Sequence, residues 1–332
     1  MTDKAIHRAD IAVCRDIITR GSKSFSLAAR LFDAQTRDDA FCLYGWARMC
    51  DDAIDGSHLG FKTGDAPAEL PMFEMLGRLE KLKSQTSAAF QGDVPDDDTL
   101  PSAVLRAFAE VVRRRGVPQA YALELLEGMA MDVRHQRYET IDNLSLYCYR
   151  VAGTVGLMMS HIMGLRDDQA LRHAADMGMA MQLTNIARDV AEDFEAGRIY
   201  LPLSWLEQAD IPLERMLEPV YRGSLASVVR RLLTEANRLY LSGDAGLFAL
   251  RFKAACAVGA ARRVYSEIGR RVESRGGLAW ETRTVVPASR KAAMAAAGVA
   301  TAVRTLPRRW LSPWRAAPIK SIWNPFSTAD KN

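Results

Sequence analysis

Two separate stretches of the sequence carry oxygen-bearing side chains at helical spacing. In the first, Asp51 and Asp55 are four residues apart, so on a helix they would share one face. The second has spacings of three, four and four. Its members are Gln182, Asn185, Asp189 and Asp193. Carboxylate and amide oxygens are the ligands that hard divalent cations such as Mg²⁺ prefer, so both stretches are candidate metal sites.

The surroundings of these two stripes favour a functional reading. Neighbouring carboxylates of like charge cost roughly 0.2–0.5 kcal/mol per pair on an isolated helix. They cost more on helices that are otherwise apolar, as these are. Arg48 and Arg188 lie beside them in the sequence. Two such stripes could face each other and hold a diphosphate through bridging Mg²⁺. The competing interpretation is that each stripe is a solvated helix face.

The elements that must position these residues are predicted to be helices. Strand signals are nearly absent and a period near 3.6 dominates the apolar pattern. The predicted helical segments are residues 8–20, 36–56, 69–90, 101–115, 118–136, 141–165, 167–196, 222–242 and 246–275. Short connections between them indicate a single all-α domain.

Composition excludes several classes of protein. The chain has 332 residues and a net charge of only +4, which does not suggest nucleic-acid binding. Its five cysteines are scattered without a CxxC pair, so we expect reduced core residues and no zinc site. Residues 1–10 lack the apolar core of a signal peptide, and no apolar run reaches the roughly 18 residues that span a bilayer. These features predict a cytoplasmic protein.

The C-terminal segment differs from the rest of the chain. From residue 289 onward, arginine and lysine mix with Trp310, Trp314 and Trp323, and acidic residues are missing until Asp330. We therefore predict a domain over residues 1–288 and a tail over residues 289–332. Such a composition is typical of a segment that rests peripherally on an anionic membrane, here the inner face. The alternative is a disordered basic tail.

Five blocks, in order along the chain, carry a family resemblance. They are Gly21–Phe25, Cys50–Asp55, Tyr147–Gly156, Gln182–Asp189 and Gly197–Pro202. Together they resemble the squalene and phytoene synthase family, and within it the bacterial phytoene synthases. The similarity runs from about residue 15 to about residue 290. Arg150 departs from the family pattern, which has a smaller or neutral residue there.

The resemblance implies an all-α isoprenoid-synthase fold, a helical bundle around a central cavity. It implies three Mg²⁺ ions, with Mn²⁺ left open as a substitute, and no nicotinamide. Two geranylgeranyl diphosphates would be joined head to head through prephytoene diphosphate to give phytoene, with release of diphosphate.

The resemblance also implies roles for single residues. The metal ligands would be Asp51, Asp55, Asn185, Asp189 and Asp193. The substrate contacts would be Ser22, Lys23, Arg48, Gln182, Arg188, Tyr265 and Arg283. Tyr147 would contact diphosphate and belongs to the catalytic set with the four aspartates. The general base stays open between Tyr147 and the released diphosphate.

Two alternatives remain at this point. A sister enzyme making squalene, hydroxysqualene or diapophytoene from farnesyl diphosphate shares the same motifs. A non-catalytic helical membrane adaptor, using the basic tail, would leave both acidic stripes dispensable.

Overall fold

The structure is a computed structural model that describes residues 8–21, 29, 31–55, 57–58, 61–62, 70–287, 289–290, 293–294, 296–298, 300 and 303. The prediction of an all-α chain is confirmed: the described residues are helical apart from turns and one short antiparallel pair. That pair joins β1 (Ser57–His58) to β2 (Phe61–Lys62). None of the described helices is long and apolar enough to cross a membrane.

The chain divides into two compact units, which we describe separately. The N-terminal unit comprises residues 1–134 and 158–165, and the C-terminal unit comprises residues 135–157 and 166–332. Helix α8 (Thr154–Ile162) contributes residues to both. The boundary that the sequence predicts at residue 288 is a different one and stays a prediction.

Helix α3 is the centre of the N-terminal unit. The other described α-helices that lie wholly within this unit are α1 (Arg8–Gly21), α4 (Met72–Gln91), α5 (Leu100–Arg115) and α6 (Gln119–Val133). Helix α3 (Ala34–Asp55) packs against α1, α4 and α5. Its Trp46 stacks on Phe108 of α5 at 4.4 Å between ring centroids and donates a hydrogen bond to Thr86 of α4 at 3.2 Å. This buried contact fixes the turn of α3 that precedes Arg48 and Asp51.

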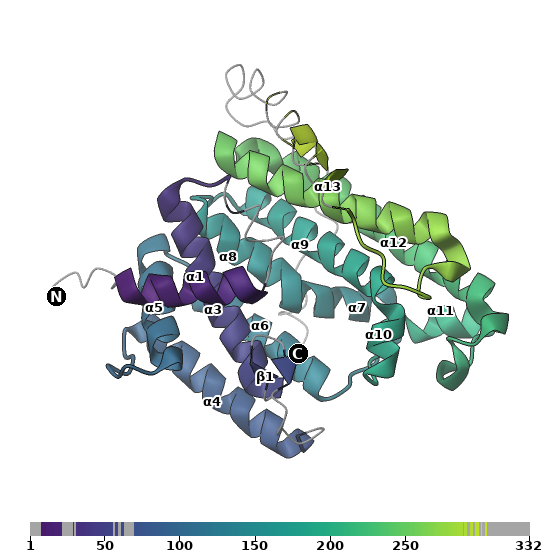
Figure 1. Ribbon diagram of the computed structural model, residues 1–332, viewed down its shortest axis with the longest axis horizontal. Helices are drawn as coiled ribbons and strands as arrows, with labels where there is room; N and C mark the ends of the chain where they lie inside the picture. Colours follow the sequence, from purple (N-terminus) through teal and green to yellow (C-terminus); the bar gives the residue numbers. More distant parts are fainter. Residues whose placement is uncertain are drawn as a thin grey trace. The chain divides into compact units, whose positions relative to one another are not determined.

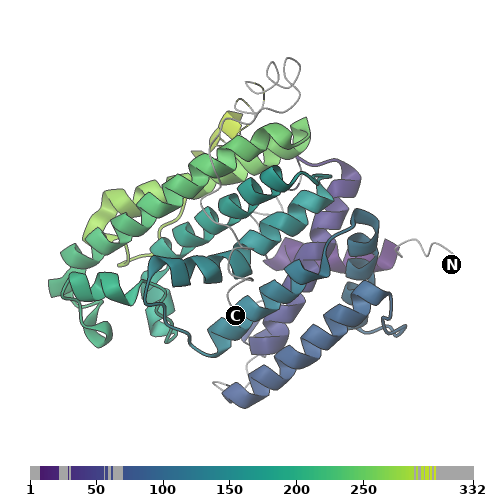
Figure 2. The same cartoon turned by 180° about the vertical axis from the view of Figure 1, so that it is seen from behind.

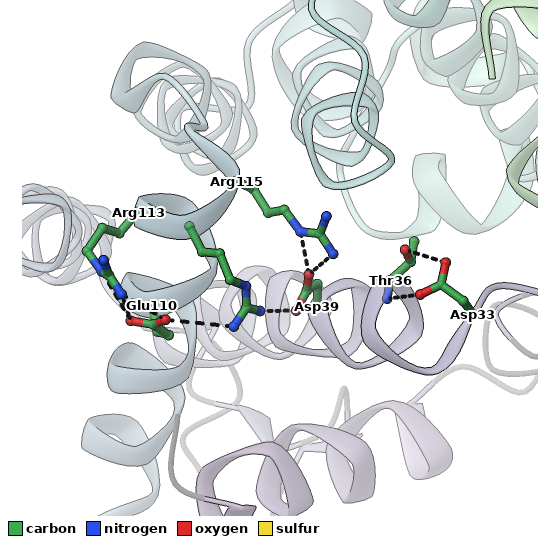
Figure 3. Close-up of polar contacts among 7 residues, drawn as sticks. Asp33, Thr36, Asp39, Glu110, Arg113 and Arg115 are labelled. Carbon is green, nitrogen blue, oxygen red and sulfur yellow. Dashed lines mark hydrogen bonds and ion pairs between the residues drawn. The ribbon is translucent and has the colours of Figure 1, made fainter. Parts of the chain in front are cut away.

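A second anchor of α3 is ionic (Figure 3). Asp39 is only 2% exposed and binds both Arg114 and Arg115, at the end of α5. The Arg115 Nε donates to Asp39 at 2.6 Å. One turn earlier, Asp33 caps the start of α3 by accepting from the Thr36 backbone N–H at 3.0 Å, and this hydrogen bond lowers the pKa of Asp33.

Helix α9 is the centre of the C-terminal unit. The α-helices of this unit are α7 (Ile141–Cys148), α9 (Asp168–Arg188), α10 (Val190–Glu195), α11 (Leu203–Gln208), α12 (Arg222–Gly246) and α13 (Phe252–Arg275). Short 3₁₀ turns η2 (Leu213–Arg215), η3 (Pro219–Tyr221), η4 (Leu247–Ala249) and η5 (Gly276–Leu278) connect the later helices. Both α12 and α13 pack along α9 (Figures 1 and 2).

A buried polar network joins α9 to α12. The Ser242 hydroxyl donates to Asp176 at 2.5 Å and contacts the His173 Nδ1 at 2.9 Å. Because the single Ser242 proton goes to Asp176, the imidazole Nδ1 must carry the proton that it shares with Ser242. Burial lowers the pKa of His173, which keeps this ring neutral. These two buried hydrogen bonds therefore help to set how α9 lies along α12.

The middle of α9 also approaches the backbone of the π-helix η1 (Tyr149–Gly153). A Cβ on Gly178 would lie 2.3 Å from the Ala152 carbonyl oxygen, so only glycine permits this approach. The sequence predicted one helix over residues 141–165, and that was wrong in detail. The π-helix interrupts it directly after Cys148 and includes Arg150, the residue that departs from the family pattern.

Other predicted boundaries also needed correction. Helix α12 runs on to Gly246, and α13 begins at Phe252 rather than at residue 246, because the 3₁₀ turn η4 lies between them. The short helix α11 was missed. All five cysteines are buried and form no disulfide, as predicted. Beyond residue 288, Arg290 binds Glu267 of α13 at 2.9 Å, and the tail tryptophans lie outside the described residues.

Replacing Asp39 with alanine should destabilise the protein by about 2–3 kcal/mol, because two arginines would lose their shared counter-charge next to the core. Chemical denaturation monitored by circular dichroism measures this change. The matched control is Asp38→Ala, which removes the adjacent carboxylate and its 2.9 Å pair with the exposed Arg15. That control should cost less than about 1 kcal/mol. Equal losses in the two variants would contradict the anchoring role of Asp39.

Candidate functional site

The polar stripe of the C-terminal unit lies on two helices. The sequence predicted one continuous helix over residues 167–196. Instead, the chain bends at Asp189, whose φ of −100° and ψ of 19° separate α9 from α10. The backbone hydrogen bonds continue through the bend: Asp189 N–H donates to Asn185 at 2.8 Å, and Asp193 N–H donates to Asp189 at 2.8 Å. The polar stripe therefore continues from α9 into α10, but its direction changes at Asp189.

Asp189 lies between two arginines. The Arg188 Nε donates to one of its carboxylate oxygens at 2.7 Å, and the Arg188 Nη2 donates to the other. The Arg283 guanidinium approaches the same carboxylate at 3.2 Å. Burial disfavours the charged form of Arg188, but its bonds to Asp189 outweigh burial and raise the Arg188 pKa. Two cations thus converge on one partly buried carboxylate.

The segment that carries Arg283 is tied to the end of α9. The Trp280 indole N–H donates to the Ala187 carbonyl oxygen at 3.0 Å. Arg283 also lies 3.9 Å from Glu192 of α10. Tyr265 of α13 is near enough to Arg188 to contribute to its raised pKa. The structure therefore brings Arg188, Tyr265 and Arg283 together near Asp189, and their contact with substrate phosphate stays a prediction.

The side chain of Asn185 has an oxygen atom that could bind a cation. Its Oδ1 is buried and has no hydrogen-bond partner among the described residues, while its amide nitrogen donates to Gln182 at 3.4 Å. A buried acceptor without a partner is costly unless something binds it. Amide and carboxylate oxygens are what Mg²⁺ accepts, so Asn185 with Asp189 and Asp193 fits such an ion.

Within the described residues, no three His, Cys, Asp or Glu side chains gather closely enough to hold a metal ion by themselves. A cation at this stripe would need the Asn185 amide, water or substrate oxygens as further ligands. Mg²⁺ sites in phosphate-transferring enzymes commonly share ligands with the substrate in this way. The donor set is thus compatible with a site completed by a diphosphate.

Asp193 lines a small pocket of the C-terminal unit. The other lining residues are Ile186, Val190, Arg198, Ile199, Tyr200, Leu201 and Met216. Most of these side chains are apolar, so the carboxylate of Asp193 is one of the few polar groups on the wall. The Arg198 backbone N–H donates to the Asp193 carbonyl oxygen at 2.8 Å and holds the pocket wall to α10.

Tyr147 belongs to a buried cluster of three tyrosines. Its ring stacks on Tyr200 with 5.0 Å between centroids and lies 5.4 Å from Tyr138. The Tyr147 hydroxyl donates to the Tyr200 hydroxyl at 3.2 Å. Sequence analysis missed a role for Tyr200, although it lies in the quoted Gly197–Pro202 block. Tyr147 and Tyr200 are 53 positions apart, so no local sequence pattern predicts that their rings stack.

The acidic stripe of the N-terminal unit lies at the end of α3. Arg48 binds Asp51 at 3.2 Å and Asp52 at 3.1 Å. The sequence singled out Asp51 with Asp55, and the structure adds Asp52 as a second partner of this arginine. The buried Nε of Arg48 has no hydrogen-bond partner among the described residues, so it can still donate to an anion. Asp55 is the last residue of α3.

Some predicted residues lie beyond what the structure describes. Ser22 and Lys23 are outside the described residues, and so is the side chain of Asp55. The pairing of the α3 stripe with the stripe on α9 and α10 stays a prediction.

Replacing Asp193 with asparagine should raise the Mg²⁺ concentration needed for half-maximal binding of inorganic diphosphate by about tenfold or more, because a charged ligand is lost. Isothermal titration calorimetry at several Mg²⁺ concentrations measures this. Glu195→Gln removes an exposed charge from the same helix and is the matched control. Its Mg²⁺ requirement should match that of the unmodified protein. An unchanged requirement in Asp193→Asn would exclude this residue as a ligand.

Comparison with known proteins finds relatives that cover most of this chain. The chain is 43% identical to a 15-cis-phytoene synthase from Pantoea ananas over 286 residues, covering 86% of this chain and 90% of that protein. It is 44% identical to a 15-cis-phytoene synthase from a Paracoccus species over 268 residues, covering 81% of this chain and 84% of that protein.

Solved structures show a similar fold. The fold matches the crystal structure of a dehydrosqualene synthase in complex with ligand, with a TM-score of 0.77 and 27% identity. The match covers 90% of this chain and 98% of that one. The predicted isoprenoid-synthase fold is thereby confirmed. A sequence model described as squalene/phytoene synthase matches residues 18–291. The chain therefore belongs to the squalene/phytoene synthase family.

Proposed function

We propose that this chain is a phytoene synthase. It joins two geranylgeranyl diphosphates head to head through prephytoene diphosphate and releases diphosphate. The observation that carries the proposal is the oxygen stripe of Asn185, Asp189 and Asp193 with Arg188 and Arg283 beside it. Its similarity to 15-cis-phytoene synthases over most of the chain supports geranylgeranyl diphosphate as the substrate.

The arginines would act by exchanging partners. Arg188 and Arg283 now neutralise Asp189. If Asp189 instead binds a cation, both guanidinium groups can turn their donors to diphosphate oxygens. Arginine suits this task because it stays charged and donates in a planar fork that matches phosphate. Diphosphate leaves with the electron pair of the broken carbon–oxygen bond, and these donors stabilise the charge that it gains.

A divalent cation fits the residues of this stripe. Asn185, Asp189 and Asp193 would hold Mg²⁺ in the C-terminal unit, and Asp51 and Asp55 would hold it in the N-terminal unit. When bound, the metal supplies Lewis-acid stabilisation of the leaving diphosphate. Gln182 would support Asn185 through their shared hydrogen bond. Mn²⁺ has a similar preference for oxygen ligands and could replace Mg²⁺.

The remaining chemistry needs an apolar environment. The double bond of the second substrate attacks the allylic cation, and loss of a proton closes a cyclopropane ring. A second ionisation, rearrangement and final proton loss give the hydrocarbon. Water would quench each cation, so the reacting carbons must be shielded by apolar side chains. The apolar wall around Asp193 is of this kind.

Association with a membrane is part of the proposal. The product is a hydrocarbon and the segment after residue 288 is basic and rich in tryptophan. A peripheral position at an anionic surface would let the product pass directly into lipid. The domain boundary at residue 288 belongs to this proposal.

The test is to incubate purified protein with Mg²⁺ and either geranylgeranyl or farnesyl diphosphate, without reductant, and to identify products by mass spectrometry. We expect a forty-carbon hydrocarbon from geranylgeranyl diphosphate. Excess chelator should abolish it, and added Mg²⁺ should restore it. A thirty-carbon product from farnesyl diphosphate alone would move the function to a sister enzyme. Folded protein that converts neither substrate would refute the enzymatic proposal and support the membrane-adaptor alternative.

A further inference from the structure

The segment that carries Arg283 leaves the C-terminal end of α13 and returns to α9. It contacts α9 through the Trp280 hydrogen bond to the Ala187 carbonyl oxygen at 3.0 Å and through the pairing of Arg283 with Asp189 at 3.2 Å. The Arg283 side chain is 58% exposed, so burial does not fix where its guanidinium lies. Its position therefore depends on how the backbone around residue 283 is held.

Arg275, the last residue of α13, binds both sequence neighbours of Arg283. Its Nη1 donates to the Thr282 carbonyl oxygen at 2.9 Å and to the Thr284 hydroxyl at 3.0 Å. Its Nη2 donates to the Leu278 carbonyl oxygen at 2.9 Å and to the Thr282 hydroxyl at 3.0 Å. One guanidinium therefore makes four hydrogen bonds, three of them to the residues directly before and after Arg283.

The geometry of these contacts suits an arginine and not a lysine. All four acceptors are uncharged oxygens, so what they require is the direction of each donor. A guanidinium presents its donors in a rigid plane, whereas a lysine ammonium is a compact charge on a flexible stem. A lysine at position 275 would keep a positive charge at the helix C-terminus but could not hold the same acceptors in place. Thr284 is only 4% exposed, which gives Arg275 a buried anchor.

A second arginine of α13 holds the segment just beyond Arg283. Arg271 lies four residues before Arg275, so the two share one face of α13. The Arg271 Nη1 donates to the Val285 carbonyl oxygen at 3.0 Å, and its Nε donates to the buried Glu267 at 3.0 Å. The backbone is thus tied to α13 on both sides of Arg283, and Arg275 makes the ties adjacent to it.

We propose that Arg275 is a positioning residue that fixes the backbone on both sides of Arg283 and so directs the Arg283 guanidinium to the Asp189 site, where it meets the diphosphate. The inference rests on the proposed function, because it takes Arg283 as a diphosphate contact. The competing role of Arg275 is general stabilisation of the segment. The two roles differ in whether the effect of Arg275 on ligand binding requires Arg283.

The experiment is a double-mutant cycle on the full chain, with Mg²⁺ and inorganic diphosphate as the probe, measured by isothermal titration calorimetry. Arg283→Ala should weaken diphosphate binding about tenfold, because a charged donor is lost. Arg275→Lys should weaken it about fivefold, because Arg283 is no longer held in place. In the Arg283→Ala background, Arg275→Lys should have less than about a twofold further effect, because it acts through Arg283.

A second variant makes the test independent of how well Arg275→Lys folds. Thr284→Val removes one acceptor of Arg275 and should weaken diphosphate binding about threefold, again only when Arg283 is present. Circular dichroism and thermal unfolding check the fold of each variant. Arg230→Lys is the matched control, since it makes the same change at an exposed arginine of α12 that lies 3.9 Å from Glu273. Its diphosphate affinity should stay within about twofold of that of the unmodified protein.

Equal fold losses for Arg275→Lys with and without Arg283, or no loss in either background, would overturn the positioning role. Unaltered binding in Arg283→Ala would also overturn it. Conversion of geranylgeranyl diphosphate by the unmodified chain is followed in parallel. The expected binding cycle without any product would refute the proposed function alone, whereas product formation with no effect of Arg275→Lys on binding would overturn this inference alone.

Discussion

The charge of Asp189 is the constraint on which the C-terminal unit depends. This carboxylate lies at the bend between α9 and α10, where Arg188 and Arg283 neutralise it. Without them, a partly buried carboxylate so close to Glu192 and Asp193 would be strongly disfavoured. The requirement explains why the segment after α13 returns to α9, with Trp280 bonded to the Ala187 carbonyl oxygen.

The same arrangement would allow the arginines to exchange the Asp189 carboxylate for a phosphate. An ion pair between arginine and carboxylate needs little reorganisation to become a metal-bound carboxylate beside an arginine-bound phosphate, because the charges are already in place. The Asn185 Oδ1, buried without a hydrogen-bond partner among the described residues, marks where a further ligand is prepared. In the N-terminal unit, Arg48 with Asp51 and Asp52 repeats the pattern of arginine beside carboxylates.

Much of this could be predicted from the sequence, and the limits have physical causes. The helical period and the spacing of Asn185, Asp189 and Asp193 predicted a shared helix face. The bend at Asp189 could not be predicted from the helical period, and neither could the contact of Asp189 with Arg283, 94 positions away. Likewise the π-helix after Tyr147 follows close packing between η1 and α9 at Gly178, a tertiary contact without a local signal. The contact of Tyr200 with Tyr147 became visible only in the structure, where the two rings stack.

The most direct test of the account is to crystallise the full chain with Mn²⁺ and a non-cleavable thiolodiphosphate analogue of geranylgeranyl diphosphate, and to locate manganese by anomalous scattering. The account predicts manganese coordinated by oxygens of Asn185, Asp189 and Asp193 and by the diphosphate, with Arg188 turned from Asp189 to the phosphate. Manganese bound elsewhere, with Asp189 still paired to both arginines and the analogue in place, would contradict it.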